Sequence, residues 1–443
     1  MCPYDPPHLK KNIRLRDPGK SVRKGSYSKS SMTSTGIGII CHPKRLTNCF
    51  LRKIISIMIE DYLKNITSYT GTKILLDDFV KNKIRFYKGY RNQDLGGLTK
   101  NYVSGLSPAI SRRIITEYEI VKQISKHVQY NDVDKFVDEI CWRTYWKGWL
   151  EHRPAVWHDY LDDLTYFNDN NKKYDIYHRA IDGETGLECF DAWVSELREY
   201  GYIHNHARMW FASIWVFYFD IPWQLGADFF YRNLLDADPA SNTLSWRWVS
   251  GLQTKGKRYI ASKSNIDRFT GNRFKFPENF YVKEKEIIDS RVYEPKMNIQ
   301  YQNSSPNYKK GILIHEEDLS LSFVEKNIPI MMQYKTHNPF GQTSLPVDLA
   351  NRSIENSIER CKKKFGSNIV TTFDWSDPQK LRKWISDHNL EMIEVTAPTV
   401  GKFESLIPST LKNMNVEISY KYHDWDLSFW RFSDKGFFKL KNK

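Results

Sequence analysis

Apolar residues recur at helical spacing along much of the chain before residue 276. The first such face is formed by Ile54, Ile55, Met58, Ile59 and Tyr62. The same period predicts helices at 73–87, 186–200, 204–220 and 228–235, and two more within 107–149. Residues 154–184 show no clear period, and we expect them to be irregular.

The hydrophobic pattern changes after residue 310. Short apolar runs at 311–314, 328–332 and 391–395 predict buried strands, with helices predicted at 347–365 and 377–388. Strands that alternate with helices are typical of a parallel sheet in an α/β layer. The sequence therefore predicts a mainly α protein whose helical part is followed by a small α/β domain.

The two ends of the helical part differ from it in composition. Residues 1–50 carry ten Lys or Arg against two Asp, which predicts a disordered segment that could also hold an organellar transit peptide. The stretch before the first strand is polar and rich in Pro and Asn, as in a linker. We expect a basic N-terminal segment at 1–46, a helical domain at 47–275, a linker at 276–310 and an α/β domain at 311–443.

The overall composition narrows the class of protein. A net charge of +14 favours polyanionic partners, nucleic acid first, although an ordinary lysine-rich protein fits as well. The 14 Trp, 26 Tyr and 24 Phe suit a large buried cofactor or stacked bases, and equally suit ordinary helix packing. No apolar run is long enough for a membrane span, so no membrane association is expected. The six cysteines form no C-x-x-C pair, which disfavours a zinc ribbon and favours a reducing compartment.

One predicted helix carries Glu139, Trp142 and Arg143 at offsets of three and four, hence on one face. A carboxylate, an indole and a guanidinium together can bind an aromatic, partly anionic ligand. The alternative is an amphipathic helix in which Glu139 pairs with Arg143 while Trp142 belongs to the core.

A second polar group interrupts the apolar helix that follows Gly201. Arg208 stands between Asn205 and Met209, and a buried arginine needs a partner because an unpaired buried charge is costly. Asp236 or Asp238 could supply that partner, in a site or in a purely structural ion pair.

The acidic pair Asp236 and Asp238 suggests either a metal or a cofactor. No histidine or further acid follows at metal-ligand spacing, so no metal is expected. Hydrogen bonds to a cofactor ring or to ribose hydroxyls fit better. Asn242 both donates and accepts, so it could adapt to a ring nitrogen whose protonation changes.

Trp223, Trp246 and Trp248 are candidate redox residues because indoles can relay electrons by hopping, although they could simply pack. The chain lacks the glycine-rich fingerprints of nicotinamide dehydrogenases and P-loop enzymes, and the G-x-S-x-G of α/β hydrolases.

The order and spacing of these segments, over roughly residues 85–275, resemble the photolyase/cryptochrome family. The resemblance is carried by Ser104-Gly-Leu-Ser-Pro108, Cys141-Trp-Arg143, Gly201–Phe211 and Leu235–Trp248. It implies an all-helical photolyase-type FAD-binding domain followed by a Rossmann-like α/β domain. It also implies FAD as cofactor and light-driven electron transfer as the chemistry.

The resemblance assigns roles residue by residue. FAD would contact Tyr87, Ser104, Leu106, Ser107, Arg143, Asn205, Arg208, Asp236, Asp238 and Asn242. The substrate would contact Glu139, Trp142, His206, Met209 and Trp248. Catalysis would use Glu139 and Asn205, with Trp246 and Trp223 as inner and middle members of an electron relay. The outermost relay residue could be Tyr174, Tyr177 or Trp193.

Asn205, Met209 and Asn242 are similar to the residues of family enzymes that repair cyclobutane pyrimidine dimers. The resemblance therefore implies a photolyase-like carbon–carbon lyase acting on DNA that contains such dimers, in the cytoplasm, the nucleus or an organelle. The alternative is a cryptochrome-like blue-light photoreceptor that signals through a protein partner bound to the C-terminal domain. The α/β domain follows the helical domain here instead of preceding it, so an antenna cofactor is not expected.

Overall fold

The computed structural model describes residues 57–97, 102–254, 256–296 and 308–441. The predicted disordered segment 1–46 lies outside these residues, as does any transit peptide. The helix predicted from residue 51 is seen from residue 57 to residue 66. From residue 61 onward the described residues form one compact unit.

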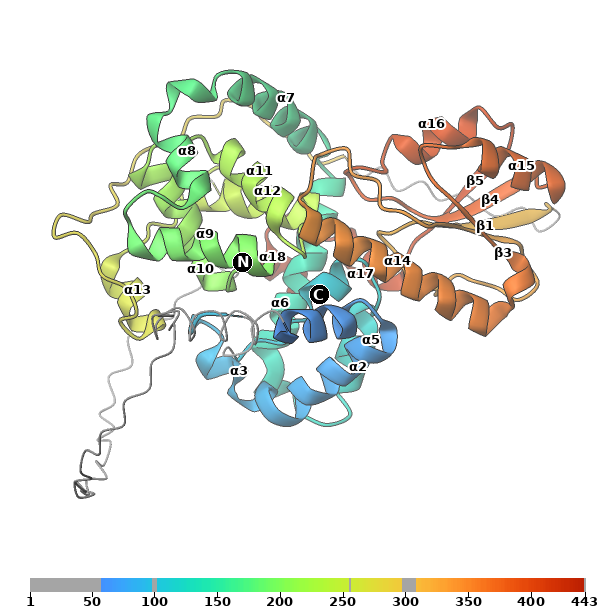
Figure 1. Ribbon diagram of the computed structural model, residues 1–443, viewed down its shortest axis with the longest axis horizontal. Helices are drawn as coiled ribbons and strands as arrows, with labels where there is room; N and C mark the ends of the chain where they lie inside the picture. Colours follow the sequence, from blue (N-terminus) through green and yellow to red (C-terminus); the bar gives the residue numbers. More distant parts are fainter. Residues whose placement is uncertain (1–56, 98–101, 255, 297–307, 442–443) are drawn as a thin grey trace, which may run out of the picture. The chain divides into compact units, whose positions relative to one another are not determined.

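The helical part reaches residue 270 (Figure 1). Its helices are α2 (Tyr69–Asp78), α3 (Ile84–Tyr90), α4 (Ser107–Ser111), α5 (Glu117–Ile124), α6 (Tyr130–Glu151), α7 (Ala155–Asp169), α8 (Asp175–Asp182), α9 (Glu188–Tyr200), α10 (Asn205–Ser213), α11 (Trp223–Asn233), α12 (Pro239–Val249) and α13 (Lys263–Thr270). Two π-helical turns, Phe79–Lys83 and Ile214–Tyr218, interrupt this pattern. The prediction of a mainly α protein is confirmed.

The expectation of an irregular stretch at 154–184 is wrong, because α7 and α8 occupy most of it. Val156, Trp157 and Tyr160 are buried on one face of α7, so the helical period is present but short. The stretch before the α/β domain has neither helix nor strand from residue 280 to residue 296. It lies against α7, where the Tyr293 hydroxyl donates to Asp159 at 2.8 Å.

The C-terminal part contains a parallel five-stranded sheet. Its strands are β1 (Lys310–Ile314), β2 (Ile330–Gln333), β3 (Val370–Phe373), β4 (Met392–Thr396) and β5 (Glu417–Lys421). They lie in the order β3-β2-β1-β4-β5, and Ile312 of β1 is opposite Ile330 of β2 and Glu394 of β4. The alternating strands and helices predicted from the sequence are confirmed, whereas β3 and β5 were not predicted.

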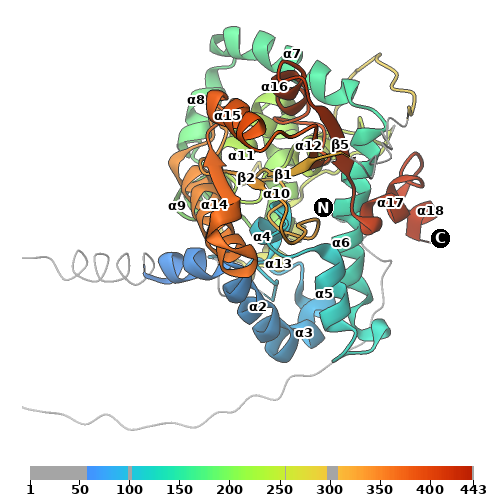
Figure 2. The same cartoon turned by 90° about the vertical axis from the view of Figure 1, so that its right-hand side faces the viewer.

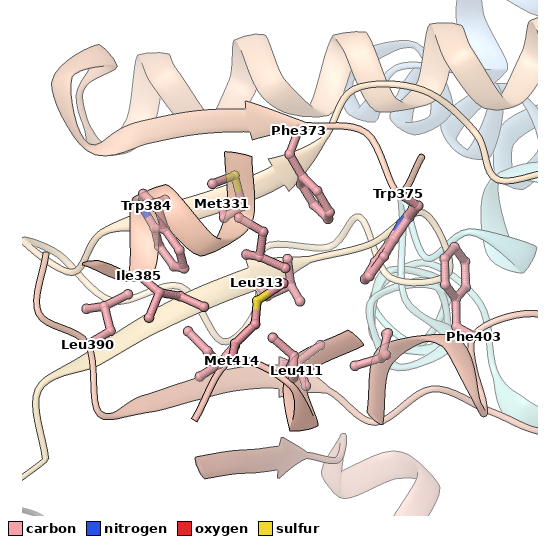
Figure 3. Packing of buried hydrophobic residues seen from close by; sticks show 14 residues of the cluster. Leu313, Met331, Phe373, Trp375, Trp384, Ile385, Leu390, Phe403, Leu411 and Met414 are labelled. Carbon is pink, nitrogen blue, oxygen red and sulfur yellow. The ribbon is translucent and has the colours of Figure 1, made fainter. Parts of the chain in front are cut away.

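Helices cover both faces of this sheet. Figure 1 shows α14 (Ser344–Phe365) on one face and α15 (Gln379–Asp387) and α16 (Leu406–Lys412) on the other. The core between the sheet and the second pair is drawn in Figure 3, where Leu313 and Phe373 meet Trp384 and Leu411. Both faces of β1 are therefore buried, as expected of a central parallel strand.

Two short helices, α17 (Asp424–Trp430) and α18 (Phe437–Lys441), end the described chain and lie beside α6 (Figure 2). The indole of Trp425 donates to the Thr144 hydroxyl at 2.8 Å. Gly148 permits this approach, since a Cβ there would lie 2.5 Å from the Trp430 ring. Within the described ranges, no helix is both long and apolar enough to cross a membrane.

Candidate functional site

A cavity lies among α3, α6, α10, α11 and α12 in the helical part. It has a volume of about 210 Å³ and is partly open to solvent. Its lining is Tyr87, Ser104, Ser107, Ile110, Phe136, Glu139, Ile140, Arg143, Asn205, Arg208, Phe230, Leu234, Asp236, Ala237, Asp238, Ser241, Asn242, Ser245 and Trp246. The structure thus brings together most of the residues that the sequence singled out.

Helix α6 presents one face to this cavity, through Phe136, Glu139, Ile140 and Arg143. Arg143 donates to the Asp238 carboxylate at 2.6 Å, while Glu139 lies 3.7 Å from the Arg91 guanidinium. The Glu139–Arg143 pair considered from the sequence is therefore not how these two charges are balanced. Arg143 and Glu139 are each paired with a different residue.

Arg208 on α10 and Asp236 before α12 form a bidentate ion pair, with N–O distances of 3.1 and 3.0 Å. The geometry settles which acid pairs with Arg208. Burial acts to raise the pKa of Asp236, but the charge and hydrogen bonds of Arg208 outweigh it and hold that pKa below its ordinary value. Asp236 is therefore an anion fixed at the cavity wall.

Asp238 is the N-cap of α12, and its side chain accepts from the Ser241 backbone N–H at 2.9 Å. Burial opposes its ionisation, but Arg143 and Lys147 keep the pKa of Asp238 below its usual value. One turn further along α12, the Asn242 amide donates to the Ala227 carbonyl at 2.8 Å, which leaves its amide oxygen for a ligand.

Several buried donors of the cavity lack a hydrogen-bond partner among the described residues. They are Nε and Nη2 of Arg143, the Ser241 hydroxyl and the indole Nε1 of Trp246. Orphaned buried donors are rare in folded proteins, because leaving one unsatisfied costs about 1–3 kcal/mol. Donors that share one concave wall with two fixed carboxylates therefore indicate a site for a polar ligand with an apolar ring system.

The segment Ser104–Pro108, which was predicted to contact FAD, divides between cavity and core. Ser104 and Ser107 line the cavity, whereas Leu106 is fully buried beside it and outside the lining. Gly105 has a φ of +67°, a left-handed conformation that favours glycine, and its carbonyl accepts from the Tyr62 hydroxyl at 2.6 Å. The turn therefore exposes the two serines while Leu106 anchors it.

Other predicted site residues lie outside the cavity lining. Trp142 is 6% exposed and stacks on Phe437 of α18, with ring centroids 3.7 Å apart. Met209 is buried within α10, and Trp248 packs on Tyr259. Of the five residues expected to contact the substrate, only Glu139 lines the cavity.

His206 and Trp223 also have partners elsewhere. The His206 ring is within hydrogen-bond distance of the Asn92 carbonyl, 3.1 Å, and the Tyr259 hydroxyl, 3.2 Å. Trp223 stacks on Tyr160 with centroids 5.6 Å apart. Their assigned roles in substrate binding and electron relay stay predictions.

Sequence reasoning did not find several of the lining residues. Phe136 and Ile140 flank Glu139 at offsets of three and one, so the helical period could have identified them. Ser241 and Ser245 follow Asp238 along α12 at offsets of three and seven, and the same argument applies. No local signal points to Arg91, because its pairing with Glu139 depends on the contact between α3 and α6.

Residues 136–321 match the family model described as the FAD binding domain of DNA photolyase. A deoxyribodipyrimidine photo-lyase of Agrobacterium fabrum is 33% identical over 189 residues, covering 41% of this chain and 38% of that protein. A cryptochrome DASH of Natronomonas pharaonis is 28% identical over 191 residues, covering 42% of this chain and 40% of that protein.

The crystal structure of a class III photolyase from Agrobacterium tumefaciens aligns at 29% identity with a TM-score of 0.39, over 46% of this chain and 43% of that one. The chain spans about two fifths of the length of the curated relatives it matches.

The cavity fits the cofactor of that family. Its fixed acids and orphaned donors can bind the polar edge of a flavin, while Phe230 and Trp246 offer apolar surface for its rings. Ser104, Ser107 and Arg143 add donors suited to phosphate oxygens. The match over residues 136–321 indicates a FAD binding domain similar to that of DNA photolyase, with FAD as its cofactor.

Proposed function

We propose that this protein repairs cyclobutane pyrimidine dimers in DNA, using blue light and FAD. The observation that carries the proposal is that Glu139 and Asn205 line the same cavity as Asp236, Asn242 and Trp246. A group able to hydrogen-bond a damaged base thus lies on the same wall as groups that hold the flavin. Bound FAD would supply the electron after absorbing light.

The protein's own residues would bind and orient the substrate. A net charge of +14 favours contacts with DNA phosphates. A dimer flips out of the duplex at low cost, because damaged bases stack and pair poorly. The Glu139 carboxylate accepts hydrogen bonds from the flipped base, and Arg91, 3.7 Å away, holds that carboxylate in place. Asn205, which lines the same cavity, would contact both the flavin and the substrate.

A second candidate function has its own observation. Trp142, which the family resemblance places against the lesion, is stacked on Phe437, so no base can stack on that ring face while α18 stays in place. A photoreceptor needs no access for a base. The alternative is therefore a flavin-binding light sensor that signals through the C-terminal part.

Repair of an oligonucleotide containing one thymine dimer tests the proposal. The reduced, FAD-loaded protein is illuminated with blue light, and restored thymines are counted against a dark control. Glu139→Gln should lower light-dependent restoration while FAD stays bound, and Glu355→Gln, an exposed carboxylate on α14, should restore thymines as the parent protein does. If the parent protein binds FAD but restores no thymines, the proposal is refuted and the sensor is favoured. If Glu139→Gln restores thymines as well as the parent protein does, the role assigned to Glu139 is refuted.

A further inference from the structure

Three aromatic side chains contact one another at the surface of the helical part. Phe86 and Tyr90 are each 43% exposed and lie one turn apart on α3. Tyr102 is partly buried and meets both rings, with centroids 6.0 Å from Phe86 and 4.9 Å from Tyr90. Single exposed apolar side chains are normal in proteins, whereas exposed apolar side chains that gather in one patch are typical of interaction sites. These three residues are called the aromatic cluster below.

The aromatic cluster borders the cavity that fits FAD. Tyr87 directly follows Phe86 and lines the cavity. Arg91 directly follows Tyr90, and its guanidinium lies 3.7 Å from Glu139, which also lines the cavity. Successive side chains of a helix point about 100° apart, so α3 presents one face to the cavity and the adjacent face to solvent. A ligand that enters the cavity at Glu139 therefore passes close to the aromatic cluster.

The stretch that carries α3 is strongly basic. Residues 79–93 contain five Lys or Arg and no Asp or Glu. Lys88 and Arg91 are paired with acids of α6, whereas Arg85 is exposed and forms no ion pair with any described residue. The Arg85 guanidinium lies 6.0 Å from the centroid of the Phe86 ring. An uncompensated positive charge thus lies directly beside the aromatic cluster.

Charge and ring chemistry together indicate the partner of this surface. A second copy of the chain, at a net charge of +14, and residues 1–50, with ten Lys or Arg, both carry the wrong sign of charge. Nucleic acid combines phosphates, which basic side chains attract, with base rings, which stack on aromatic side chains. In a duplex each base face is covered by its neighbours, so only an unpaired base can stack on the protein.

We propose that the aromatic cluster stacks on unpaired bases of the DNA strand that carries the lesion, while Arg85 contacts the phosphates of that strand. Because the aromatic cluster borders the cavity at Glu139, it holds nucleotides next to the dimer. The inference rests on the proposed function and specifies its substrate, a DNA strand whose bases beside the dimer are unpaired. The protein therefore binds a single strand more tightly than the matched duplex.

Fluorescence anisotropy in the dark tests this inference with the full-length, FAD-loaded protein and undamaged DNA. The probes are a labelled oligothymidine of about 16 nucleotides, the upper site size of one single-strand-binding module, and the same strand paired with oligoadenosine. Tyr90→Ala should weaken binding of the single strand about 5- to 150-fold, as expected for the loss of one base–ring stack, and leave duplex binding unchanged. Phe86→Ala should reproduce this loss, and Tyr90→Phe, which keeps the ring, should bind as the parent protein does.

The salt dependence of binding separates stacking from charge. Arg85→Gln should make the slope of log affinity against log salt concentration less steep by about 0.7, the value for one phosphate contact with a single strand. Tyr90→Ala should lower the affinity without changing that slope. Tyr118→Ala is the matched control, because Tyr118 of α5 is 56% exposed and has Lys122 5.5 Å from its ring, but contacts no other described ring. This control should bind both probes as the parent protein does.

Two results would overturn the inference. Tyr90→Ala could bind the single strand as tightly as the parent protein, or it could lose single-strand and duplex binding equally. In the first case, a parent dimer that dissociates in Tyr90→Ala, measured by light scattering, would identify the aromatic cluster as a contact between copies of the chain. Circular dichroism and flavin absorbance report that each variant is folded with its flavin site intact. Undamaged DNA binds without light or repair, so failure of repair and failure of stacking are separate results.

Discussion

Arg113 joins the helical part to the C-terminal part through three buried acids. Its guanidinium donates to both oxygens of Asp426, at 2.7 and 2.5 Å, and lies 3.6 Å from Glu117 and 3.8 Å from Asp318. All four side chains are at most 6% exposed. Replacing Arg113 with Met keeps much of the side-chain volume but leaves these carboxylates without their shared cation.

The expected cost follows from which partners remain. Glu117 keeps Arg143 at 3.9 Å, and Asp318 keeps the His423 ring at 2.5 Å, while Asp426 loses both of its Arg113 hydrogen bonds. Breaking a buried pair by removing one partner costs about 3–5 kcal/mol. We expect Arg113→Met to lower the free energy of unfolding at pH 7 by about that amount.

Urea unfolding of the FAD-loaded protein, followed by circular dichroism and by flavin fluorescence, measures this loss. Arg198→Met is the control, because that arginine pairs with Asp182 at the surface, where such a pair contributes about 0–1 kcal/mol. A shift of the midpoint no larger than the control's would refute the reasoning.

The pH dependence gives a second check. Burial acts to raise the pKa values of Glu117 and Asp318. Arg113 and Arg143 nevertheless hold the pKa of Glu117 below its ordinary value, and His423 and Arg113 do the same for Asp318. Depressed carboxyl pKa values stabilise the fold above the unfolded pKa of about 4, and that stability is lost as the pH falls through the folded values. The deficit of Arg113→Met should therefore be largest at neutral pH and shrink under acid conditions. A deficit that grows as the pH falls would contradict this account.

Two further predictions concern buried carboxylates. Asp236→Asn leaves Arg208 without its bidentate partner, so we expect purified protein to contain less FAD. The flavin-to-protein absorbance ratio measures this content, and an unchanged ratio would contradict the role assigned to Asp236. Burial raises the pKa of Glu151 to about 8, so the parent protein should lose stability relative to Glu151→Gln as the pH rises from about 4.5 to 8. A difference in melting temperature between the two proteins that does not change over this pH range would contradict the prediction.

The sequence predicted the elements whose apolar pattern is regular, either as a helical period over several turns or as a continuous apolar run. Helix α6 and strand β1 were predicted for this reason. Helix α7 was missed because its aspartates lower helix propensity and its buried stripe is short. Strand β3 was missed because Val370-Thr-Thr-Phe373 is too short to show a period, and it is a strand through its pairing with β2.

For the site, sequence spacing identified which side chains share a wall but not which partner each one takes. Offsets along α6 placed Glu139 and Arg143 on one face, and the family resemblance added Asp238 and Asn242; all four line one cavity. The pairing of Arg143 with Asp238 joins residues 95 positions apart, and no local pattern encodes that contact. The same limit applies to Trp142, whose helical face was predictable while its partner Phe437 was not.

The cavity wall therefore has two sides that can be tested independently. On one side, Trp246 is fully buried and meets the buried ring of Trp215 edge-on. Glu139 and Asn205 form the other side, and their value as substrate contacts depends on whether a base can reach them past Trp142 and α18. Phe437→Ala removes the ring that covers Trp142. If this substitution raises repair, α18 limits access to an active enzyme. If repair is absent with and without Phe437, the light sensor is the better account of the protein.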